Sequence, residues 1–194
     1  MKLGFIGTGK IASSVITGIC NSKIKFNKIL ISARNKKIAS KLKKNFKKVL
    51  IAKNNQEIVD NCNWVFLSIT PIVGEKIIKN LKFRSSQTII SFISTITLSE
   101  LKKAIKVKAK IVRAIPLPPI SLKKGPVPIC PPNKKVKAFF DKVGTTVALR
   151  DTIKLIPKVE DRYGGLYMSQ VSIIFQRYFV VLILFIIFWP LFCL

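Results

Sequence analysis

The chain has 194 residues, 49% of them hydrophobic, which suits one globular domain of common size and an extension. It carries 35 Lys and Arg residues against 8 Asp and Glu residues, a formal charge of +27, and has no histidine, which excludes zinc sites that use histidine and Cys–His nucleophiles. The charge would attract nucleic acid or an anionic membrane. However, the lysines are spread among Ile and Asn residues, which share AT-rich codons, and no aromatic and basic platform for single strands is visible. We therefore attribute the charge to genome composition and expect no specific nucleic-acid partner.

The first 35 residues predict a strand, a glycine turn, a helix and a second strand. An apolar run over 2–6 leads into the turn, and a helical apolar pattern precedes a second apolar run over 29–31. This is the context of a dinucleotide-binding fingerprint. The first glycine permits the tight turn, the second lets the backbone approach a pyrophosphate, and a third small residue lets the helix pack on the sheet. The alternative is a β-α turn that is merely tight. The predicted nucleotide site consists of Gly7, Thr8, Gly9, Lys10, Ile11 and Ala12.

The end of the second strand indicates which nucleotide is bound. NAD-preferring enzymes usually carry Asp or Glu there to bind the ribose 2′-OH, whereas this chain has Ser32-Ala33-Arg34-Asn35. A hydroxyl, a guanidinium and an amide suit a 2′-phosphate, which a carboxylate would repel. We predict NADP(H) as the cofactor. The alternative is that Arg34 is one more solvated cation.

Strand and helix patterns alternate as far as residue 149. Strands are predicted over 49–52, 64–69, 88–92, 110–115 and 146–149, and helices over 36–48, 75–81, 99–105 and 134–143, with a further helical segment after 54–55 that ends near residue 61. A rigid proline loop is predicted over 116–119 and an extended segment over 127–130. The run 64–69 is too apolar to be half exposed, so we expect a central parallel strand that stops at Thr70-Pro71. The predicted fold is α/β: a Rossmann-like, doubly wound, mostly parallel sheet. Ligands of such sheets bind at the carboxyl ends of the strands. This places around one crevice Gly7, Ser32, Thr70-Pro71, Ser94-Thr95 and Pro116.

Five segments together resemble the N-terminal half of pyrroline-5-carboxylate reductases, in that family's order and at about its spacing. They are Gly4 to Ala12, Ser32 to Asn35, Asn55 to Val59, Phe66 to Pro71 and Val112 to Pro116. The resemblance implies an oxidoreductase that reduces a cyclic imine to L-proline by hydride transfer from NAD(P)H. It also implies that Ser32, Arg34 and Asn35 hold the adenosine phosphate end. The rest of the cofactor would be lined by Asn55, Ser68, Ile69, Thr70, Pro71, Ser94 and Thr95.

The chain departs from the family pattern in three segments of this crevice, and two of the departures remove polar groups from its nicotinamide and substrate side. The family commonly has Lys where this chain has Thr70, Ala-Gly where it has Ser94-Thr95, and Pro-Asn-Thr-Pro over 116–119, where this chain has Pro-Leu-Pro-Pro. The chain also has no histidine and no convincing general acid, so no catalytic residue is assigned. Cofactor binding is therefore predicted more firmly than proline synthesis.

The chain changes character after residue 150. The family continues with a helical domain that forms a homodimer and carries a Gly-Ser-rich substrate motif, and no such motif is present here. We predict three parts: an NADP-binding domain over 1–150, a linker or degenerate start of a helical domain over 151–177, and an apolar helical tail over 178–194. The tail has no charged residue, and its 17 residues are at the lower limit for crossing a bilayer.

Three interpretations of the tail are open. It is a membrane anchor beside a basic domain, a buried helix of a shortened dimer domain, or an out-of-frame translation. We favour the last, which makes the chain a truncated and inactive reductase. The alternative function is a membrane-tethered, non-catalytic NADP-binding module.

Cysteine spacing and the N-terminus indicate the compartment. Cys20, Cys62, Cys130 and Cys193 show no CxxC spacing, so no metal site is expected. We interpret the first three as small, buried apolar residues in a reducing compartment. The glycine fingerprint begins where the apolar region of a signal peptide would have to lie, so we expect no signal peptide. The expected location is the cytoplasm, with membrane association through 178–194 as the alternative.

Overall fold

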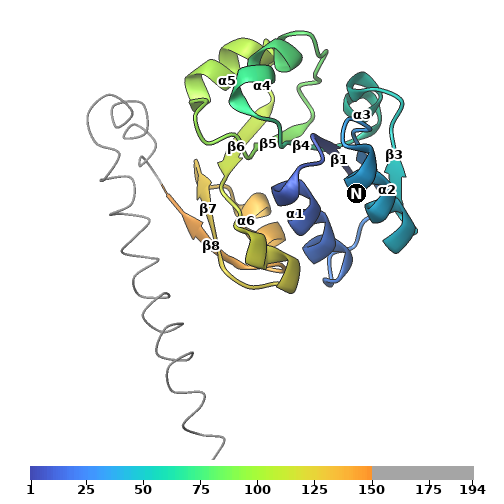
Figure 1. Cartoon of the computed structure of the whole chain (residues 1–194). Helices are drawn as coiled ribbons and strands as arrows, with labels where there is room; N and C mark the ends of the chain where they lie inside the picture. Colours follow the sequence, from blue (N-terminus) through green and yellow to red (C-terminus); the bar gives the residue numbers. More distant parts are fainter. Residues whose placement is uncertain (150–194) are drawn as a thin grey trace, which may run out of the picture. The chain divides into compact units, whose positions relative to one another are not determined.

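A computed structural model of the chain describes residues 1–149, which form one eight-stranded sheet with helices on both faces (Figure 1). The strand order is β3-β2-β1-β4-β5-β6-β7-β8. The elements are β1 (Lys2–Ile6), α1 (Lys10–Cys20), β2 (Lys28–Ile31), α2 (Lys36–Asn45), β3 (Val49–Ile51), α3 (Asn55–Asn61), β4 (Trp64–Leu67), α4 (Pro71–Lys79), β5 (Thr88–Ser91), α5 (Leu98–Ile105), β6 (Lys110–Ala114), the 3-10 helix η1 (Pro118–Leu122), β7 (Pro126–Cys130), α6 (Lys134–Phe140) and β8 (Thr145–Ala148). The predicted Rossmann-like fold is confirmed. The predicted apolar tail over 178–194 and the predicted linker over 151–177 lie outside the described residues.

Two apolar cores, one on each face of the sheet, hold the layers together. One core joins alternate strand residues to α1, α2, η1 and α6, and the other joins the remaining strand residues to α3, α4 and α5. Figure 1 shows α4 and α5 together at the top of the view. The helices thus wind on both sides of the sheet, as the alternating pattern predicts.

Strand β4 lies in the middle of the parallel part, between β1 and β5. Val65, Phe66 and Leu67 are fully buried, because neighbouring residues of a strand point to opposite faces and both faces are covered. The Phe66 ring stacks on Phe5 of β1, with 4.3 Å between ring centroids. The prediction of a central parallel strand is confirmed.

Strand β7 runs in the opposite direction to the six strands before it, which the alternating sequence pattern did not predict. Strand β7 pairs antiparallel with β6, and β8 pairs parallel with β7. Parallel neighbours need a long crossover, usually a helix, whereas only the short η1 separates β6 from β7. The predicted rigid loop over 116–119 contains the start of η1. This helix packs on α1 at Gly18, where a Cβ atom would lie 2.2 Å from the Ile120 carbonyl oxygen.

Some element ends differ from the sequence-based expectation. Strand β4 ends at Leu67 rather than near residue 69, and α4 begins at Pro71 rather than at Glu75. The proline does not stop a strand there; it occupies the first turn of a helix, where the missing N–H costs nothing and φ is already helical. The helix predicted over 36–48 ends at Asn45, with Ala39 and Leu42 as its buried residues.

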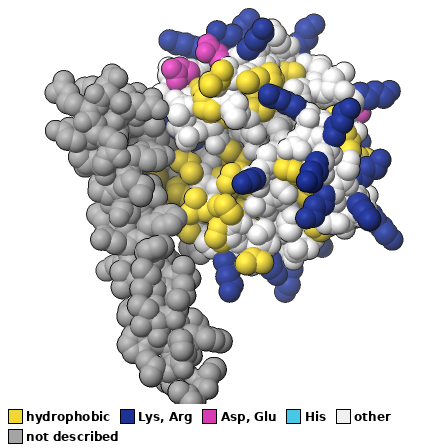
Figure 2. Space-filling view, viewed as in Figure 1, with side chains coloured by type: hydrophobic (Ala, Val, Ile, Leu, Met, Phe, Trp, Pro, Cys, Tyr) yellow, Lys and Arg dark blue, Asp and Glu magenta, His cyan; other side chains and the backbone are white. Residues whose placement is uncertain are grey.

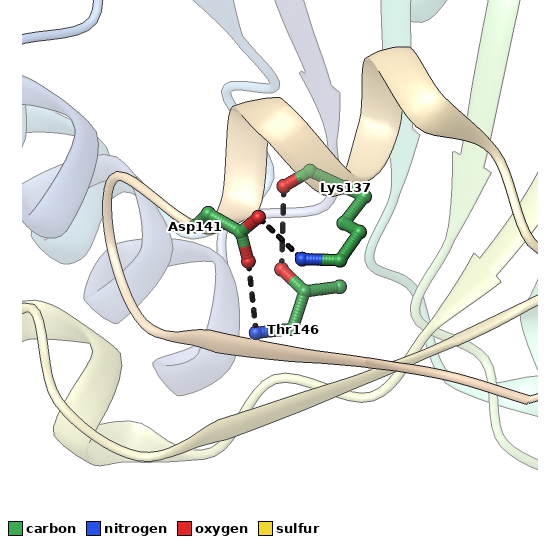
Figure 3. Close-up of polar contacts among 3 residues, drawn as sticks. All are labelled: Lys137, Asp141 and Thr146. Carbon is green, nitrogen blue, oxygen red and sulfur yellow. Dashed lines mark hydrogen bonds and ion pairs between the residues drawn. The ribbon is translucent and has the colours of Figure 1, made fainter.

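A small polar network near the end of the described residues joins α6 to β8 (Figure 3). Asp141 accepts a hydrogen bond from the Lys137 ammonium group at 2.7 Å and another from the backbone N–H of Thr146 at 3.1 Å. The Thr146 hydroxyl donates to the Lys137 carbonyl oxygen at 3.3 Å. These bonds fix the turn that leads into the last strand.

The chain is strongly basic, and Lys and Arg side chains project along the top, right and bottom of the face shown in Figure 2. Ion pairs join Glu75 to Lys79 and Asp141 to Lys137, in each case four residues apart, and exposed pairs of this kind contribute little to stability. No helix within residues 1–149 has both the length and the apolar character needed to span a membrane.

Candidate functional site

The carboxyl ends of the parallel strands bring most of the predicted site residues to one edge of the sheet. Strands β1, β2, β4, β5 and β6 run in the same direction, so the segments that follow them emerge at the same edge. The strand order reverses between β1 and β4, with β2 and β3 on one side and β5 and β6 on the other. Open α/β sheets bind their ligands outside such a switch point. The residues placed there are Gly7 to Ala12, Ser32, Ser68 to Pro71 and Ser94-Thr95.

Gly7 is required by the fold itself. Its φ angle is +99°, a conformation that L side chains rarely adopt. A Cβ atom at this position would lie 2.1 Å from the carbonyl oxygen of Ser68, which directly follows β4. The first glycine of the fingerprint therefore lets the β1–α1 turn pass close to the β4 chain.

Gly9 has no such requirement. Its φ angle of −79° is open to any residue, and a Cβ atom there would find no atom of residues 1–149 within 4 Å apart from those of Gly9 and its two chain neighbours. The space above the Gly9 backbone is open at the start of α1, next to the exposed Lys10. A small residue at this point suits the approach of a ligand and is not needed for packing. The next small residue, Ala12, is fully buried against the sheet, while Ile11 is partly buried.

The two helices that start at the switch point, α1 and α4, differ from the other α-helices in how their N-termini are capped. Helices α2, α3, α5 and α6 each have a side chain that accepts a hydrogen bond from the first turn, from Asn35, Asn54, Thr97 and Asn133. Within the described chain, α1 and α4 have no such side-chain cap; their N-cap residues are Gly9 and Thr70. These two helices follow the adjacent strands β1 and β4. Their N–H groups, together with the helix dipoles, suit an anion such as a pyrophosphate.

A buried hydrogen-bond network beneath the glycine turn includes three more predicted residues. Ser32 is 4% exposed; its hydroxyl accepts the Gly7 N–H at 3.0 Å and donates to the Asn55 amide oxygen at 2.8 Å. The Thr8 hydroxyl donates to the Ser32 carbonyl oxygen at 3.2 Å. The polar groups of Ser32 are thus engaged within the protein. The structure places Ser32, Asn55 and Thr8 as supports of the turn, which is a different role from the phosphate contact predicted for Ser32.

The other two residues predicted for the adenosine phosphate, Arg34 and Asn35, are exposed. Asn35 caps α2 by accepting the Ile38 N–H at 3.2 Å. The first turn of α2 has no acidic residue and contains the exposed Lys36 and Lys37. Cations at a helix N-terminus are unfavourable unless an anion is nearby. Sequence reasoning attributed the lysines in general to genome composition, although the position of these two beside Arg34 was a usable signal.

The segments after β4 and β5 form the other half of the edge. Ser68 and Ile69 are partly buried, and the Ser68 N–H donates to the Ile6 carbonyl oxygen at 2.8 Å, whereas Thr70 and Pro71 are exposed. After β5, Ser94 is partly buried and Thr95 is exposed. The Ser94 carbonyl oxygen accepts a hydrogen bond from Arg113 of β6. Arg113 lies in one of the matching segments, but no role was predicted for it. Pro116, also expected at this edge, is buried.

The thiol groups of Cys20 and Cys62 are unsuited to nucleophilic chemistry. Cys62 and Cys130 are buried as expected, whereas Cys20 is only partly buried because it ends α1. Burial raises the pKa of Cys20 and of Cys62 to about 11, so both are thiols at neutral pH. No group of three or more Cys, Asp or Glu residues within 1–149 could hold a metal ion.

The chain is similar to known oxidoreductases over this part. Residues 2–95 match a family described as NADP oxidoreductase coenzyme F420-dependent. Pyrroline-5-carboxylate reductase 3 of Xenopus laevis is 27% identical over 130 residues, which cover 66% of this chain and 47% of that protein. The Danio rerio protein of the same name is 28% identical over 128 residues, or 64% of this chain and 44% of that protein. The chain thus spans about half the length of the curated relatives it matches.

Solved structures show the same likeness. The 1-pyrroline-5-carboxylate reductase of Streptococcus pyogenes is 25% identical, with a TM-score of 0.66, and the match covers 90% of this chain and 66% of that one. The Plasmodium falciparum pyrroline carboxylate reductase, solved with NADP bound, is 22% identical, with a TM-score of 0.68. That match covers 88% of this chain and 67% of the other. The resemblance to pyrroline-5-carboxylate reductases predicted from the motifs is confirmed, and the matching family is one of NADP oxidoreductases.

Proposed function

We propose that residues 1–149 bind NADP(H) at the carboxyl edge of the sheet. We also propose that the chain acts as an oxidoreductase of the pyrroline-5-carboxylate reductase type. The observation that carries this proposal is the open space above Gly9, at a helix start without a side-chain cap, directly at the switch point. A glycine that the fold does not need, beside the N–H groups of a helix start, suits a pyrophosphate.

The proposed orientation of the cofactor follows from the two halves of the edge. The adenosine 2′-phosphate would lie beside Arg34 and the first turn of α2, where exposed cations face no acidic residue of that turn. The nicotinamide half would then extend across the switch point toward Thr70 and the Ser94-Thr95 segment. Arg34 fits the 2′-phosphate because its guanidinium can bind phosphate oxygens with two hydrogen bonds.

The proposed substrate is a small cyclic imine. NADPH, when bound, supplies a hydride to the imine carbon; the C=N bond becomes a single bond, the nitrogen takes a proton, and NADP⁺ is released. The chain has no histidine to supply that proton. Because the relatives continue well beyond the matched part, the reaction and a homodimer like that of the family are proposals for this chain.

The test is imine-dependent oxidation of NADPH by the purified full chain, followed at the absorbance of the reduced nicotinamide. Gly9→Val places a branched side chain in the open space and should abolish both oxidation and NADPH binding. Lys108→Val, which adds the same side chain at an exposed position outside the carboxyl edge, is the matched control and should retain both. The proposed reaction fails if the folded chain oxidises no NADPH with the imine present, and the cofactor site fails if Gly9→Val still binds NADPH normally.

A second candidate function is an NADP-binding module tethered to a membrane at the cytoplasmic side. The observation that favours it is the run of uncharged residues over 178–194. The chain should then sediment with neutral lipid vesicles, and a variant with Lys in place of Leu182 and Ile186 should stay in the supernatant. Recovery of the unchanged chain in the supernatant would contradict this function.

A further inference from the structure

Arg113 is a charged side chain inside the protein, on the strand next to the proposed nicotinamide half of the site. It lies on β6, is 1% exposed, and is level with Ser91 of β5 in the strand register. Its neighbours Val112 and Ala114 belong to one core, so Arg113 points to the opposite face, that of α4 and α5. Burial of an arginine is costly, and its hydrogen bonds determine what it holds in place.

One of those bonds goes to the segment that joins β5 to α5. The Arg113 guanidinium donates to the carbonyl oxygen of Ser94, three residues beyond its register partner. Hydrogen bonds from a charged donor are stronger than neutral ones. Arg113 thus ties β6 to the backbone of the Ser94-Thr95 segment.

The rest of this segment is fixed on both sides of Ser94. Before it, the Ile93 N–H donates to the Ser91 hydroxyl at 3.2 Å, and the Ile93 side chain is buried. After it, Thr97 and Glu100 form a reciprocal capping box at the start of α5. Hydrogen bonds from the Thr97 backbone and hydroxyl lower the pKa of Glu100, so its carboxylate stays charged in this cap. Thr95 is the exposed residue between these fixed points.

We infer that Arg113 is a positioning residue for the nicotinamide half of the cofactor, acting through the Ser94 carbonyl to hold Thr95 at the carboxyl edge. This inference rests on the proposed NADP(H) site. It predicts that Arg113 matters for the nicotinamide half and has no effect on the adenosine half, which lies across the switch point at Arg34.

Two ligands separate these halves. NADPH occupies the whole site, whereas adenosine 2′,5′-bisphosphate carries only the adenosine end. In the full chain, Arg113→Gln should weaken NADPH binding about tenfold, the loss expected for one charge-assisted contact, and should change bisphosphate binding by less than about twofold. Arg113→Lys, which keeps the positive charge and an N–H donor but loses the planar guanidinium group, should recover part of the loss. Calorimetric titration measures both affinities, and thermal unfolding shows whether the variants are folded.

The assignment is overturned if both ligands weaken equally, which indicates general destabilisation, or if neither changes. Should Arg113→Gln not fold, amide hydrogen exchange of Arg113→Lys decides. Faster exchange is expected at 94–96 but not at 7–12, and unchanged exchange at 94–96 overturns the assignment. If the unchanged chain binds neither ligand, the NADP(H) proposal fails and this assignment fails with it. If the unchanged chain binds both ligands but the Arg113 variants weaken both equally or weaken neither, only the assignment of Arg113 fails.

Discussion

Gly7 and Ser68 lie so close together that a Cβ atom on Gly7 would be 2.1 Å from the Ser68 carbonyl oxygen. Backbone cannot yield to this contact as a flexible side chain would, and the φ angle of +99° adds further strain for any other residue. The turn after β1 therefore owes its conformation to this glycine. The role of Gly9 is different, because nothing within residues 1–149 fills the space above it.

Gly7→Ala is expected to lower the free energy of unfolding by about 3 kcal/mol or more, the range of a strained and overpacked substitution. Gly9→Ala is the matched control and should cost no more than about 1 kcal/mol, the loss of a good N-cap residue. Urea unfolding followed by circular dichroism measures both. Equal losses for the two variants would contradict the distinction between a structural glycine and a ligand-facing one.

Ser32→Ala should affect stability more than cofactor choice. The substitution leaves the Gly7 N–H and the Asn55 amide without their buried partner, which should cost about 1–3 kcal/mol. Ser40→Ala, on the exposed side of α2, is the control and should be neutral or slightly stabilising. The measurement is the urea midpoint together with the affinity ratio of NADPH to NADH. A stable variant that has lost its preference for NADPH would mean that Ser32 binds the 2′-phosphate after all.

Arg34→Gln should reduce NADPH affinity about 10- to 100-fold, because a charge-assisted contact to phosphate is lost, and should leave NADH affinity nearly unchanged. Lys41→Gln removes the same charge from the exposed face of α2 beyond its first turn and serves as the control. If both substitutions lower the affinity for NADPH to the same small extent, the basic surface acts only through its overall charge. Arg34 would then be a solvated cation.

The Asp141 network predicts a pH-dependent contribution to stability. Partial burial raises the pKa of Asp141, but the hydrogen bonds from Lys137 and Thr146 outweigh it and hold the pKa below its ordinary value of 3.8. A group with a lowered pKa in the folded state stabilises the fold above its unfolded pKa and loses that contribution as the pH falls through the folded one. Asp141→Asn should therefore be less stable than the original chain at pH 7, and the difference should shrink below about pH 4. A difference of equal size at pH 7 and pH 3 would contradict this account.

The fold of the first six strands was predictable because local pattern and topology agree. Buried strands such as β4 are apolar on both faces, and the glycine turn marks where β1 gives way to α1. The antiparallel β7 was not predictable in this way. Its direction depends on the length and packing of η1 against Gly18, a tertiary contact that leaves no periodic signal in the sequence.

The candidate site was predictable as a set of segments, while the roles of single residues were not. Strand ends and motif spacing located Gly9, Arg34 and Thr95 at one edge. Whether a hydroxyl such as that of Ser32 faces a ligand or the protein depends on hydrogen bonds between distant segments, which a single sequence does not encode locally. Arg113 was overlooked for the same reason, because its partner Ser94 belongs to another strand–helix connection. Pro71 was misjudged because a proline that ends a strand and one that begins a helix look alike in sequence.

The central claim is that NADPH binds over Gly9 at the switch point between β1 and β4. Mapping amide chemical shifts of the isotope-labelled full chain during an NADPH titration tests it most directly. The account predicts saturable shifts that are largest at residues 9–12 and 70–73, with a second group at 34–37 that is absent when NADH is used. Shifts confined to the exposed lysines of α2 and other basic surfaces, with residues 9–12 unchanged, would contradict it.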